Sequence, residues 1–296
     1  MTNYSILLKN DSDYPPLLKE IRSPPEQLYV RGDLFLLKSA CIAMVGTRAY
    51  TPYGKSLTEY FAEGLVSYGF TIVSGLAFGI DVIAHRATLK NNGKTIAVLG
   101  NGITEIYPVE HTDLAQEILE KGGAIVSEYP PNMPGQKHHF PARNRIISGL
   151  SLGTLIVEAP EKSGALITAR FAFEQNRDVF AAPGDLFRET FKGNLNLIAN
   201  DMARLVRTPE DVVAALREQP FLPLQRELQT IPQKREPPLT TRAQKLVWQN
   251  VSGHPISNEE ILEKTQLTIS ELTIALSYLE LKGYIKNMGF GRYSKI

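Results

Sequence analysis

Between Cys41 and about Arg217, apolar and polar positions repeat one pattern along the chain. Each repeat has a short apolar run, a turn rich in Gly, Ser or Asn, and an amphipathic segment long enough for a helix. Most of the apolar runs are continuous, as strands covered by helices on both faces require. The pattern predicts a doubly wound, mostly parallel α/β sheet, with strands at Cys41–Val45, Phe70–Val73, Thr95–Leu99, Ala124–Val126, Thr154–Val157, Val179–Ala181 and Arg204–Val206.

The segments that flank this repeating region (41–217) differ from it. Residues 1–40 predict an irregular lead-in with one short strand near Leu28–Arg31, because helices there are interrupted by Pro15, Pro16, Pro24 and Pro25. Residues 218–240 contain five prolines without sustained periodicity, which predicts a linker.

The last part of the chain, residues 241–296, combines short helices with a hairpin pattern. The helical patterns cover about Thr241–Val251, Ser257–Lys264 and Thr268–Lys282. They precede the strand-like stretch GYIKNMGFGRYSKI, in which Gly289 and Gly291 favour a turn. Three helices and a hairpin predict a small winged helix-turn-helix domain.

Composition narrows the class of protein. The chain has 296 residues, 43% of them hydrophobic, so it can bury a large core. Its single cysteine, Cys41, excludes an intramolecular disulfide and fits a cytoplasmic location. The N-terminus lacks signal-peptide features and no run of about 18 apolar residues occurs, which disfavours secretion and membrane spanning. The formal net charge is +1, so a nucleic-acid site would need a local cluster of cations.

The turns that follow the strands are where a doubly wound sheet binds its ligand. The first turn, in VGTRAYTPYG, contains Gly46, Thr47 and Arg48, with Pro52 near the start of the next helix. Unpaired backbone N–H groups at that helix start, beside an Arg guanidinium, are suited to a phosphate. The alternative is a tight turn with a surface ion pair.

The next two turns offer less chemistry. In SGLAFGIDVIAH, Asp81 is expected to cap the following helix, and His85 could pair with it. In GNGITE, Glu105 stands where a dinucleotide fingerprint requires its third glycine, and the chain has no P-loop pattern. NAD and ATP therefore lose support, and we expect no cofactor.

The stretch KHHFPARNRIISGLS is the most informative. Lys137, Arg143 and Arg145 surround Phe140, which places cations for phosphates beside an aromatic face for base stacking. Arg143 and Arg145, with Asn144 between them, are expected to open a helix, where the dipole disfavours cations unless an anion is present. The alternative is a solvated basic turn with Phe140 as a core residue. The adjacent histidines in this stretch have no acidic or thiol partner at suitable spacing, so we expect no metal.

A further turn, in VEAPEKSGALITARFAFE, repeats the geometry of the first. Lys162, Ser163 and Gly164 lie between a strand and a helix. Together with the first turn and the basic stretch, they could form a groove that follows a phosphate backbone.

These motifs closely resemble those of the DNA processing protein A family, also called DprA or Smf. The resemblance spans about Tyr14–Val206 and includes VGTRAYTPYG, IVSGLAFGIDVIAHRATL, TIAVLGNGITEIYP, VSEYPP, FPARNRIISGLS and IVEAPEKSGALITAR. It implies an extended Rossmann-like domain that binds and protects incoming single-stranded DNA, forms a homodimer, and helps to load the RecA recombinase during natural transformation.

The resemblance also implies which residues contact the DNA. The family's pocket falls on Gly46, Thr47, Arg48, Lys137, Phe140, Arg143, Asn144 and Arg145, and less firmly on Lys162, Ser163 and Gly164. The chain departs from the family at Phe78, where an Arg is common, at Leu195, where an Asn is usual, and at Met202, where a Gly is common.

Two other functions remain as alternatives. A nucleotide phosphoribohydrolase with the same sheet architecture needs a catalytic glutamate, but Thr168 stands at that position when Gly164 is aligned with the last glycine of its motif. A winged-helix transcription regulator needs cations on its recognition helix, but the stretch TISELTIALSYLELK offers only Lys282. Its Ile274, Tyr278 and Leu281 form a second apolar stripe, which suggests a protein contact or packing against the main domain. We therefore expect DNA binding by the central domain, without catalysis.

Overall fold

The computed structural model describes residues 4–217, 239–252, 255–289 and 291–295. The chain divides into two compact units, residues 1–233 and 234–296. Residues 218–238, which make up most of the predicted linker, lie outside the described residues. None of the helices in the described ranges is long and apolar enough to cross a membrane.

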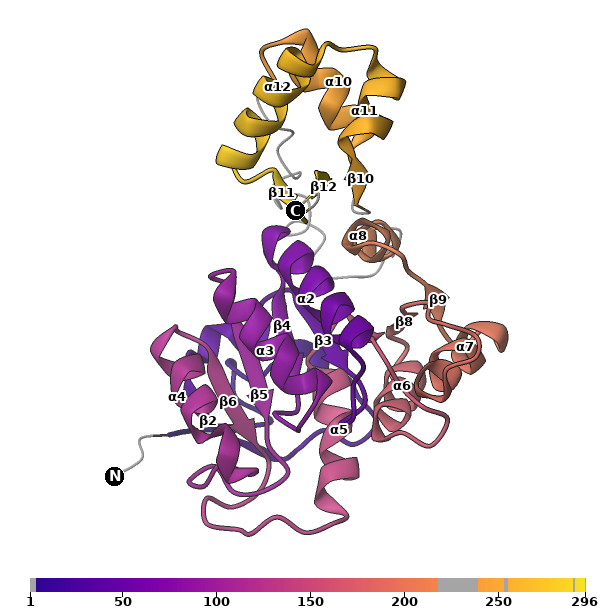
Figure 1. The fold of residues 1–296 in the computed structure, drawn as a ribbon. Helices are drawn as coiled ribbons and strands as arrows, with labels where there is room; N and C mark the ends of the chain where they lie inside the picture. The colour runs from indigo at the N-terminus through magenta and orange to yellow at the C-terminus, as the bar shows by residue number, and fades with distance from the viewer. Residues whose placement is uncertain (1–3, 218–238, 253–254, 290, 296) are drawn as a thin grey trace. The chain divides into compact units, whose positions relative to one another are not determined.

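One mixed sheet organises the first unit, and its strand order in the described residues is β1-β2-β6-β5-β4-β3-β7-β8-β9 (Figure 1). The strands from β3 to β9 are all parallel to one another where they pair. Each agrees with its predicted position to within one residue at either end, which confirms the doubly wound, mostly parallel sheet. Their bounds are β3 (Cys41–Val45), β4 (Thr71–Ser74), β5 (Thr95–Val98), β6 (Ala124–Ser127), β7 (Gly153–Ile156), β8 (Asp178–Ala181) and β9 (Arg204–Leu205).

The lead-in is more regular than the sequence predicts. Its two strands, β1 (Ser5–Leu8) and β2 (Gln27–Gly32), extend the sheet beyond β6: β2 pairs antiparallel with β6, and β1 pairs antiparallel with β2. Between and after them lie α1 (Pro16–Lys19) and the 3-10 turn η1 (Leu34–Lys38). The prediction of an irregular segment is wrong because the prolines lie at the boundaries of these elements, where no ladder or helical hydrogen bond is lost. β1 is an edge strand that buries only Leu7, so its apolar pattern is weak.

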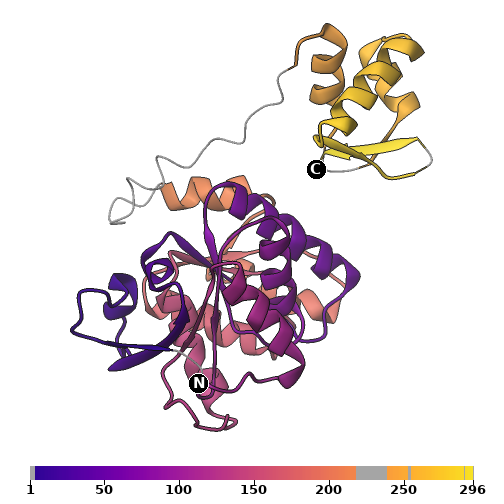
Figure 2. The same cartoon turned by 90° about the vertical axis from the view of Figure 1, so that its left-hand side faces the viewer.

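Helices cover both faces of the sheet, as the continuous apolar runs predict (Figure 2). On one face, Ile42 and Met44 of β3 share a core cluster with Phe61 of α2. On the other, Ala43 and Val45 pack in the cluster that contains Ile146 of α5. The first face carries α2 (Pro52–Ser67), α3 (Ile80–Lys90), α4 (Thr112–Glu120) and α8 (Pro209–Arg217), and the second carries α5 (His139–Gly149) and α6 (Gly164–Glu174).

Shorter elements complete the first unit. A 3-10 turn, η2 (Val109–His111), precedes α4, and a second one, η3 (Glu189–Phe191), leads into α7 (Lys192–Ala199). The latter pair follows β8, so it lies in the loop region beyond the carboxyl end of that strand.

The second unit has helices and a small sheet. Its helices are α10 (Arg242–Asn250), α11 (Asn258–Thr265) and α12 (Ile269–Leu281), and β10 (Ile256–Ser257), β11 (Ile285–Asn287) and β12 (Arg292–Lys295) pair in the order β10-β12-β11. Each helix has a capping box, in which an N-cap Thr or Ser and a Gln or Glu three residues on bond each other's backbone. This confirms the predicted winged-helix architecture.

Candidate functional site

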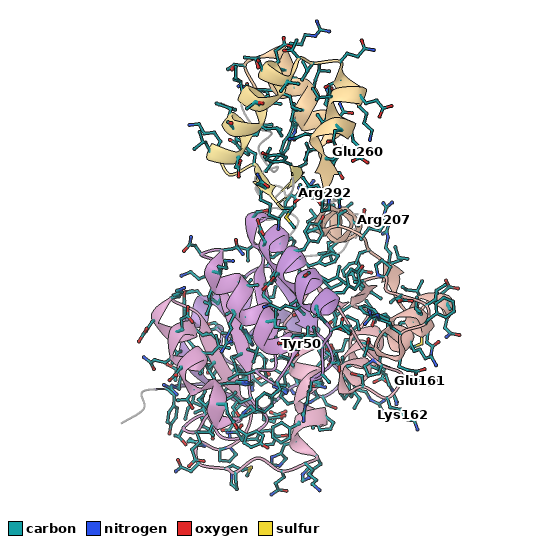
Figure 3. All side chains as sticks on the ribbon, viewed as in Figure 1. Tyr50, Glu161, Lys162, Arg207, Glu260 and Arg292 are labelled. Carbon is teal, nitrogen blue, oxygen red and sulfur yellow. The ribbon has the colours of Figure 1, made fainter. Side chains whose placement is uncertain are left out.

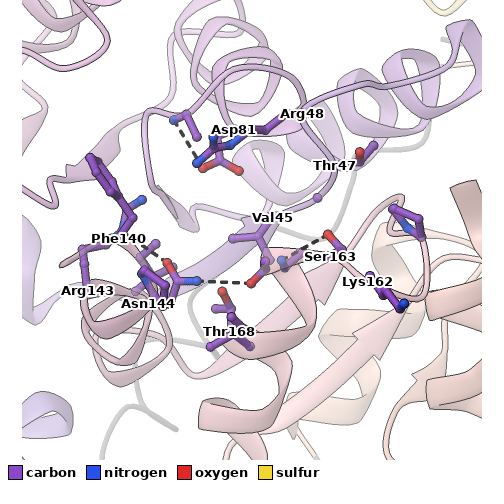
Figure 4. Close-up of a pocket in the computed structure, with 18 of the residues that line it drawn as sticks. Val45, Thr47, Arg48, Asp81, Phe140, Arg143, Asn144, Lys162, Ser163 and Thr168 are labelled. Carbon is purple, nitrogen blue, oxygen red and sulfur yellow. Dashed lines mark hydrogen bonds between the residues drawn. The ribbon is translucent and has the colours of Figure 1, made fainter. Parts of the chain in front are cut away.

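The site lies where the direction of the sheet changes. From β3 the chain builds outwards to β4, β5 and β6, and then returns to place β7 on the other side of β3. The loops that leave β3 and β7 therefore diverge, which opens a crevice at the carboxyl ends of these strands. A cavity of about 500 Å³ occupies this position, and side chains from the loops after β3, β4, β5, β6 and β7 converge on it (Figure 4).

The structure brings together nearly all of the residues that the sequence predicts. Those that line the cavity are Gly46, Thr47, Arg48, Lys137, Phe140, Arg143, Asn144, Lys162, Ser163 and Gly164. Arg145 does not line it.

The loop after β3 is held rigidly from both sides. Thr47 N–H donates to the Glu158 carbonyl at 2.7 Å, and Ile80 N–H donates to the Thr47 carbonyl at 3.1 Å. A side chain at Gly46 would come within 2.8 Å of the same Glu158 carbonyl. The backbone next to Arg48 is thus fixed, while the Arg48 side chain is exposed.

The helix start after this loop already holds an anion from the protein itself. Glu158 is fully buried, and its Oε2 accepts hydrogen bonds from Thr51 N–H at 2.9 Å and Thr51 Oγ1 at 3.2 Å. Thr51, the N-cap of α2, accepts from Gly54 N–H at 3.0 Å, and Pro52 has no N–H. The expectation of unpaired N–H groups at this helix start is therefore wrong for Thr51 and Gly54, because the Glu158 side chain and the Thr51 hydroxyl accept their hydrogen bonds. The sequence places Glu158 more than a hundred residues away and gives no local sign of this contact.

Three exposed cations surround the cavity. Arg48, Lys137 and Lys162 come from the loops after β3, β6 and β7. No ion pair engages any of the three within the residues that the structure describes. Their positive charges are available to an anionic ligand.

Arg143 and Arg145 have opposite surroundings. Arg143 is 4% exposed, and its guanidinium donates to the carbonyls of Gly75 and Val98, so it forms part of the cavity floor. Burial lowers the pKa of Arg143 to about 10, although the nearby Asp81 carboxylate favours the charged form. Arg145 instead makes a bidentate ion pair with Glu128 at 2.6 and 2.7 Å. Because the two residues are two positions apart on a helix, their side chains are rotated by about 200° from each other around the helix axis.

The helix that carries these arginines starts earlier than predicted. α5 begins at His139, so Arg143 lies in its second turn and not at its start. Pro141 is in the first turn, where its missing N–H removes no helical hydrogen bond. The prediction that Arg143 and Arg145 open the helix is wrong, and the dipole argument for an anion at that point does not hold.

An aromatic wall closes one side of the cavity. The ring centroids of Phe140 and Tyr107 are 5.3 Å apart, tilted by 41°. Phe140 is half-buried and packs over Gly100, where a side chain would come within 2.7 Å of the ring. The sequence prediction missed Tyr107, although an aromatic residue in the loop after β5 is a detectable signal. Figure 4 shows Phe140 on one side of the cavity and Lys162 on the other.

The start of α6 closes the other side of the cavity. Ser163 is the N-cap and accepts from Ala165 N–H at 3.2 Å, and Asn144 Nδ2 donates to the Gly164 carbonyl at 3.2 Å. Asn144 therefore links α5 to the loop after β7. A buried amide, Asn194, also supports this loop: its Oδ1 accepts from Ala159 N–H at 2.8 Å.

The three positions at which the sequence departs from the family pattern do not line the cavity. Phe78 is 45% exposed and packs edge-on against His111, with ring centroids 4.6 Å apart. Met202 is 37% exposed and is not a cavity residue. Next to Leu195, the Asn194 amide donates to the carbonyls of Ile156, Val157 and Ala182.

Asp81 and His85 do not pair. The N-cap of α3 is Gly79, and Asp81 Oδ2 accepts from Gly75 N–H at 3.1 Å and from Ala77 N–H at 3.4 Å. Burial raises the pKa of Asp81, whereas Arg143 and these hydrogen bonds lower it. His85 Nδ1 bonds Thr95 Oγ1 at 2.7 Å. The predicted cap and the predicted pair are both wrong, because the β4–α3 loop folds back over the carboxylate.

His85 gives a testable pH dependence. Burial lowers its pKa to about 3 from 6.5, and the electrostatic effects of His111 and Arg143 act in the same direction. Below pH 6.5 the unfolded chain binds a proton that the folded chain does not, so stability falls with pH down to about 3. We expect the free energy of unfolding to fall by about 1.4 kcal/mol between about pH 7.5 and about pH 5.5 through this residue.

Urea unfolding of the wild type and of His85→Gln at the two pH values measures this effect. The raised pKa of Asp81 acts in the opposite direction in both proteins, so the difference between them isolates His85. An equal pH dependence in both proteins would show that His85 is not buried in the neutral form.

In the described part of the chain, no group of three or more His, Cys, Asp or Glu side chains is placed to hold a metal ion. The His138 and His139 rings meet edge to face with centroids 4.5 Å apart, and His139 stacks on Tyr129 at 4.0 Å.

Fold and site together define a Rossmann-like α/β protein with a cation-rimmed cavity at its switch point and a C-terminal winged helix. Residues 5–217 match the family model of DNA recombination-mediator protein A, and residues 231–289 match that of the DprA winged helix domain. The chain belongs to the DNA recombination-mediator protein A family, DprA or Smf, as its motifs indicate.

Relatives in several bacteria support this assignment. Protein Smf of Synechocystis is 39% identical over 99% of this chain and 80% of its own length. DNA processing protein DprA of Bacillus subtilis is 45% identical over 71% of this chain and 70% of its own.

Two solved structures share the fold. DNA processing protein A from Streptococcus pneumoniae aligns with a TM-score of 0.68 at 42% identity, over 72% of this chain and 74% of that one. The protein from Helicobacter pylori, whose structure concerns its single-stranded DNA binding mode, aligns with a TM-score of 0.65 at 33% identity, over 72% of this chain and 95% of that one.

Proposed function

We propose that the cavity binds single-stranded DNA and that the protein acts by binding, without catalysis. The observation that carries this proposal is the convergence of three exposed cations, Arg48, Lys137 and Lys162, beside the aromatic wall of Phe140 and Tyr107. Cations suit the phosphates of a single strand, and an aromatic face suits its unstacked bases. The Helicobacter pylori relative, described as binding single-stranded DNA, supports the same ligand here.

The site gives little basis for sequence preference. The exposed groups are charges and rings, which every nucleotide can use, while the buried Asp81 carboxylate is engaged with backbone N–H groups. We therefore infer nearly equal affinity for strands of different sequence.

Hydrolysis of a nucleotide is less well supported. Thr168, at the position where a phosphoribohydrolase would need its glutamate, is 1% exposed beneath the cavity. A hydroxyl does not supply the general acid or base that such a reaction requires. Release of free base from a nucleoside monophosphate by the purified protein would contradict our proposal.

The winged helix is better suited to protein than to duplex DNA. The residues of α12 include no Lys or Arg, and Lys282 follows at its C-cap. Its buried face carries Leu272 and Leu279, while Ile274 and Leu281 are 69% and 87% exposed. We propose that this exposed stripe contacts a protein.

We further propose that the protein is a cytoplasmic homodimer that protects incoming single strands and helps RecA to load on them during natural transformation and DNA recombination. The family membership and the proposed DNA site support this role. Light scattering of the purified protein tests the dimer, and RecA ATPase on DNA covered by single-strand-binding protein tests the loading. We expect a molar mass twice that of the 32.9 kDa chain and a faster RecA ATPase.

Fluorescence anisotropy with a labelled single strand and the matching duplex tests the DNA ligand. We expect tighter binding of the single strand, with an affinity that falls as salt rises, since cations release counterions from the phosphates. Equal or tighter binding of the duplex would move the DNA site to the winged helix.

A further inference from the structure

A second hollow lies on the same edge of the sheet as the cavity. Its volume is about 420 Å³, and it is lined by Thr51, Pro52 and Tyr53 from the start of α2 and by Asp185 and Arg188 from the loop after β8. Strand β7 stands between β3 and β8, so both hollows lie at the carboxyl ends of adjacent strands. The loop from Gly46 to Thr51 borders both of them.

Large aromatic residues belong to the segments that line this second hollow: Tyr53 lines it, Tyr50 precedes Thr51, and Phe187 precedes Arg188. Tyr50 and Tyr53 are 45% and 49% exposed, and Phe187 is 92% exposed. Tyr50 lies in the loop before α2, and Lys162 of the first cavity lies in the loop after β7 (Figure 3). Because these large rings remain this exposed, even though Tyr53 also packs on the fold, they point to a ligand.

The rings belong to a structured surface. The Tyr53 hydroxyl donates to the Pro183 carbonyl at 3.4 Å, and its ring packs on the buried Phe191 with centroids 5.6 Å apart. Asp185 Oδ1 accepts from Phe187 N–H at 2.9 Å, which folds the tip of the loop. These contacts join the start of α2 to the loop after β8.

The same surface carries a cation. Arg188 is exposed, and its guanidinium lies 3.6 Å from the Asp185 carboxylate, an exposed pair that gives little stability. An Arg among exposed rings is the combination that binds single-stranded nucleic acid, in which bases stack and phosphates meet cations.

We propose that Tyr50, Tyr53, Phe187 and Arg188 form a second subsite, the aromatic ledge, for the part of the strand that leaves the cavity past Arg48. The proposal rests on the proposed function, because it extends the path of the same ligand. Bases stack on the rings of the ledge, and Arg188 meets a phosphate. The path then follows the carboxyl edge of the sheet from the loop after β6 to the loop after β8.

Binding of oligothymidylates of different length tests the ledge. The labelled strands range from about 4 to about 16 nucleotides, the usual span of such sites. The variant is Tyr50→Ala/Phe187→Ala, whose side chains are exposed enough for truncation to leave the fold intact. Phe35→Ala is the matched control, since Phe35 is 79% exposed and lies in η1, which follows β2. Because β2 runs antiparallel to β6, the end of β2 lies at the opposite edge of the sheet from the cavity.

We expect the ledge variant to bind the longest strand about tenfold more weakly than wild type, as the loss of base stacking predicts. The shortest strand that wild type binds is expected to bind equally to both proteins, and Phe35→Ala to match wild type throughout. A loss that is the same at every length, or no loss at any length, overturns the ledge and leaves the cavity as proposed. If Tyr50→Ala/Phe187→Ala instead dissociates a dimer in light scattering without a length-dependent loss, the rings join two copies of the chain and the ledge is wrong. If wild type binds no single strand, the proposed function fails as well.

Discussion

Replacement of Arg48 by alanine is expected to weaken binding of single-stranded DNA by about 10- to 100-fold. The Arg48 side chain is exposed at the cavity, and the backbone of the preceding residue, Thr47, is fixed by hydrogen bonds to Glu158 and Ile80. A charge-assisted hydrogen bond held in place in this way contributes about 1.5 to 3 kcal/mol. The loss is expected to be similar for strands of any sequence, and the salt dependence of log K to fall by about 0.7, since one phosphate contact is removed.

Lys137→Ala, in the loop after β6, is expected to weaken binding by a similar factor. The double variant Arg48→Ala/Lys137→Ala is expected to show the sum of the two losses in binding free energy. Anisotropy titrations at two salt concentrations measure both. Arg86→Ala is the matched control, because Arg86 is exposed on α3 and does not line the cavity. Wild-type affinity in Arg48→Ala would place the DNA elsewhere.

Arg145→Ala distinguishes the DNA contact that the sequence predicts for this residue from the ion pair that the structure shows. The sequence predicts a DNA contact, whereas the structure pairs Arg145 with Glu128 away from the cavity. We expect a lower free energy of unfolding, because a half-buried carboxylate loses its partner, and an unchanged affinity for DNA. A tenfold loss of affinity with unchanged stability would contradict the structure.

Replacement of Gly54 by alanine is expected to destabilise the protein by about 3 kcal/mol, although alanine normally favours a helix. A Cβ atom at this position would lie 1.7 Å from Glu158 Oε2. The carboxylate cannot move aside easily, because Glu158 is fully buried and holds Thr51 at the N-cap of α2. Displacing it would also disturb the loop of Arg48, so DNA binding is expected to weaken.

Gly164→Ala is the matched control for stability. Gly164 is the first residue of α6, and no atom lies within 4 Å of the position that its Cβ would take. Alanine there is expected to leave stability unchanged or to raise it by up to about 1 kcal/mol. Urea denaturation of both variants measures the contrast. A Gly54→Ala protein as stable as wild type would show that Glu158 does not occupy the start of α2.

Much of the fold is determined by local sequence patterns. The strand runs are apolar at every position because side chains on both faces of the sheet are buried, as Ile42 and Ala43 are in neighbouring positions of β3. The starts of α2 and α6 are equally local, since Pro52 and Ser163 stand where their N-terminal turns require them. The starts of α3 and α5 were not predicted correctly. The sequence did not predict β1, because an edge strand buries few side chains and its apolar pattern is therefore weak.

The sequence by itself determined which residue types follow each strand of this protein, including the cations Arg48, Lys137 and Lys162. Only the tertiary structure decided which of them share a cavity, since the order of strands brings the loops after β3 and β7 together across more than a hundred residues. It also decided that Arg143 enters the floor of the cavity while Arg145 turns away, and that Glu158 fills the anion position at the start of α2. The physical reason is that hydrophobic patterning acts over a few residues, whereas a site depends on the distances between segments that only the packed sheet sets.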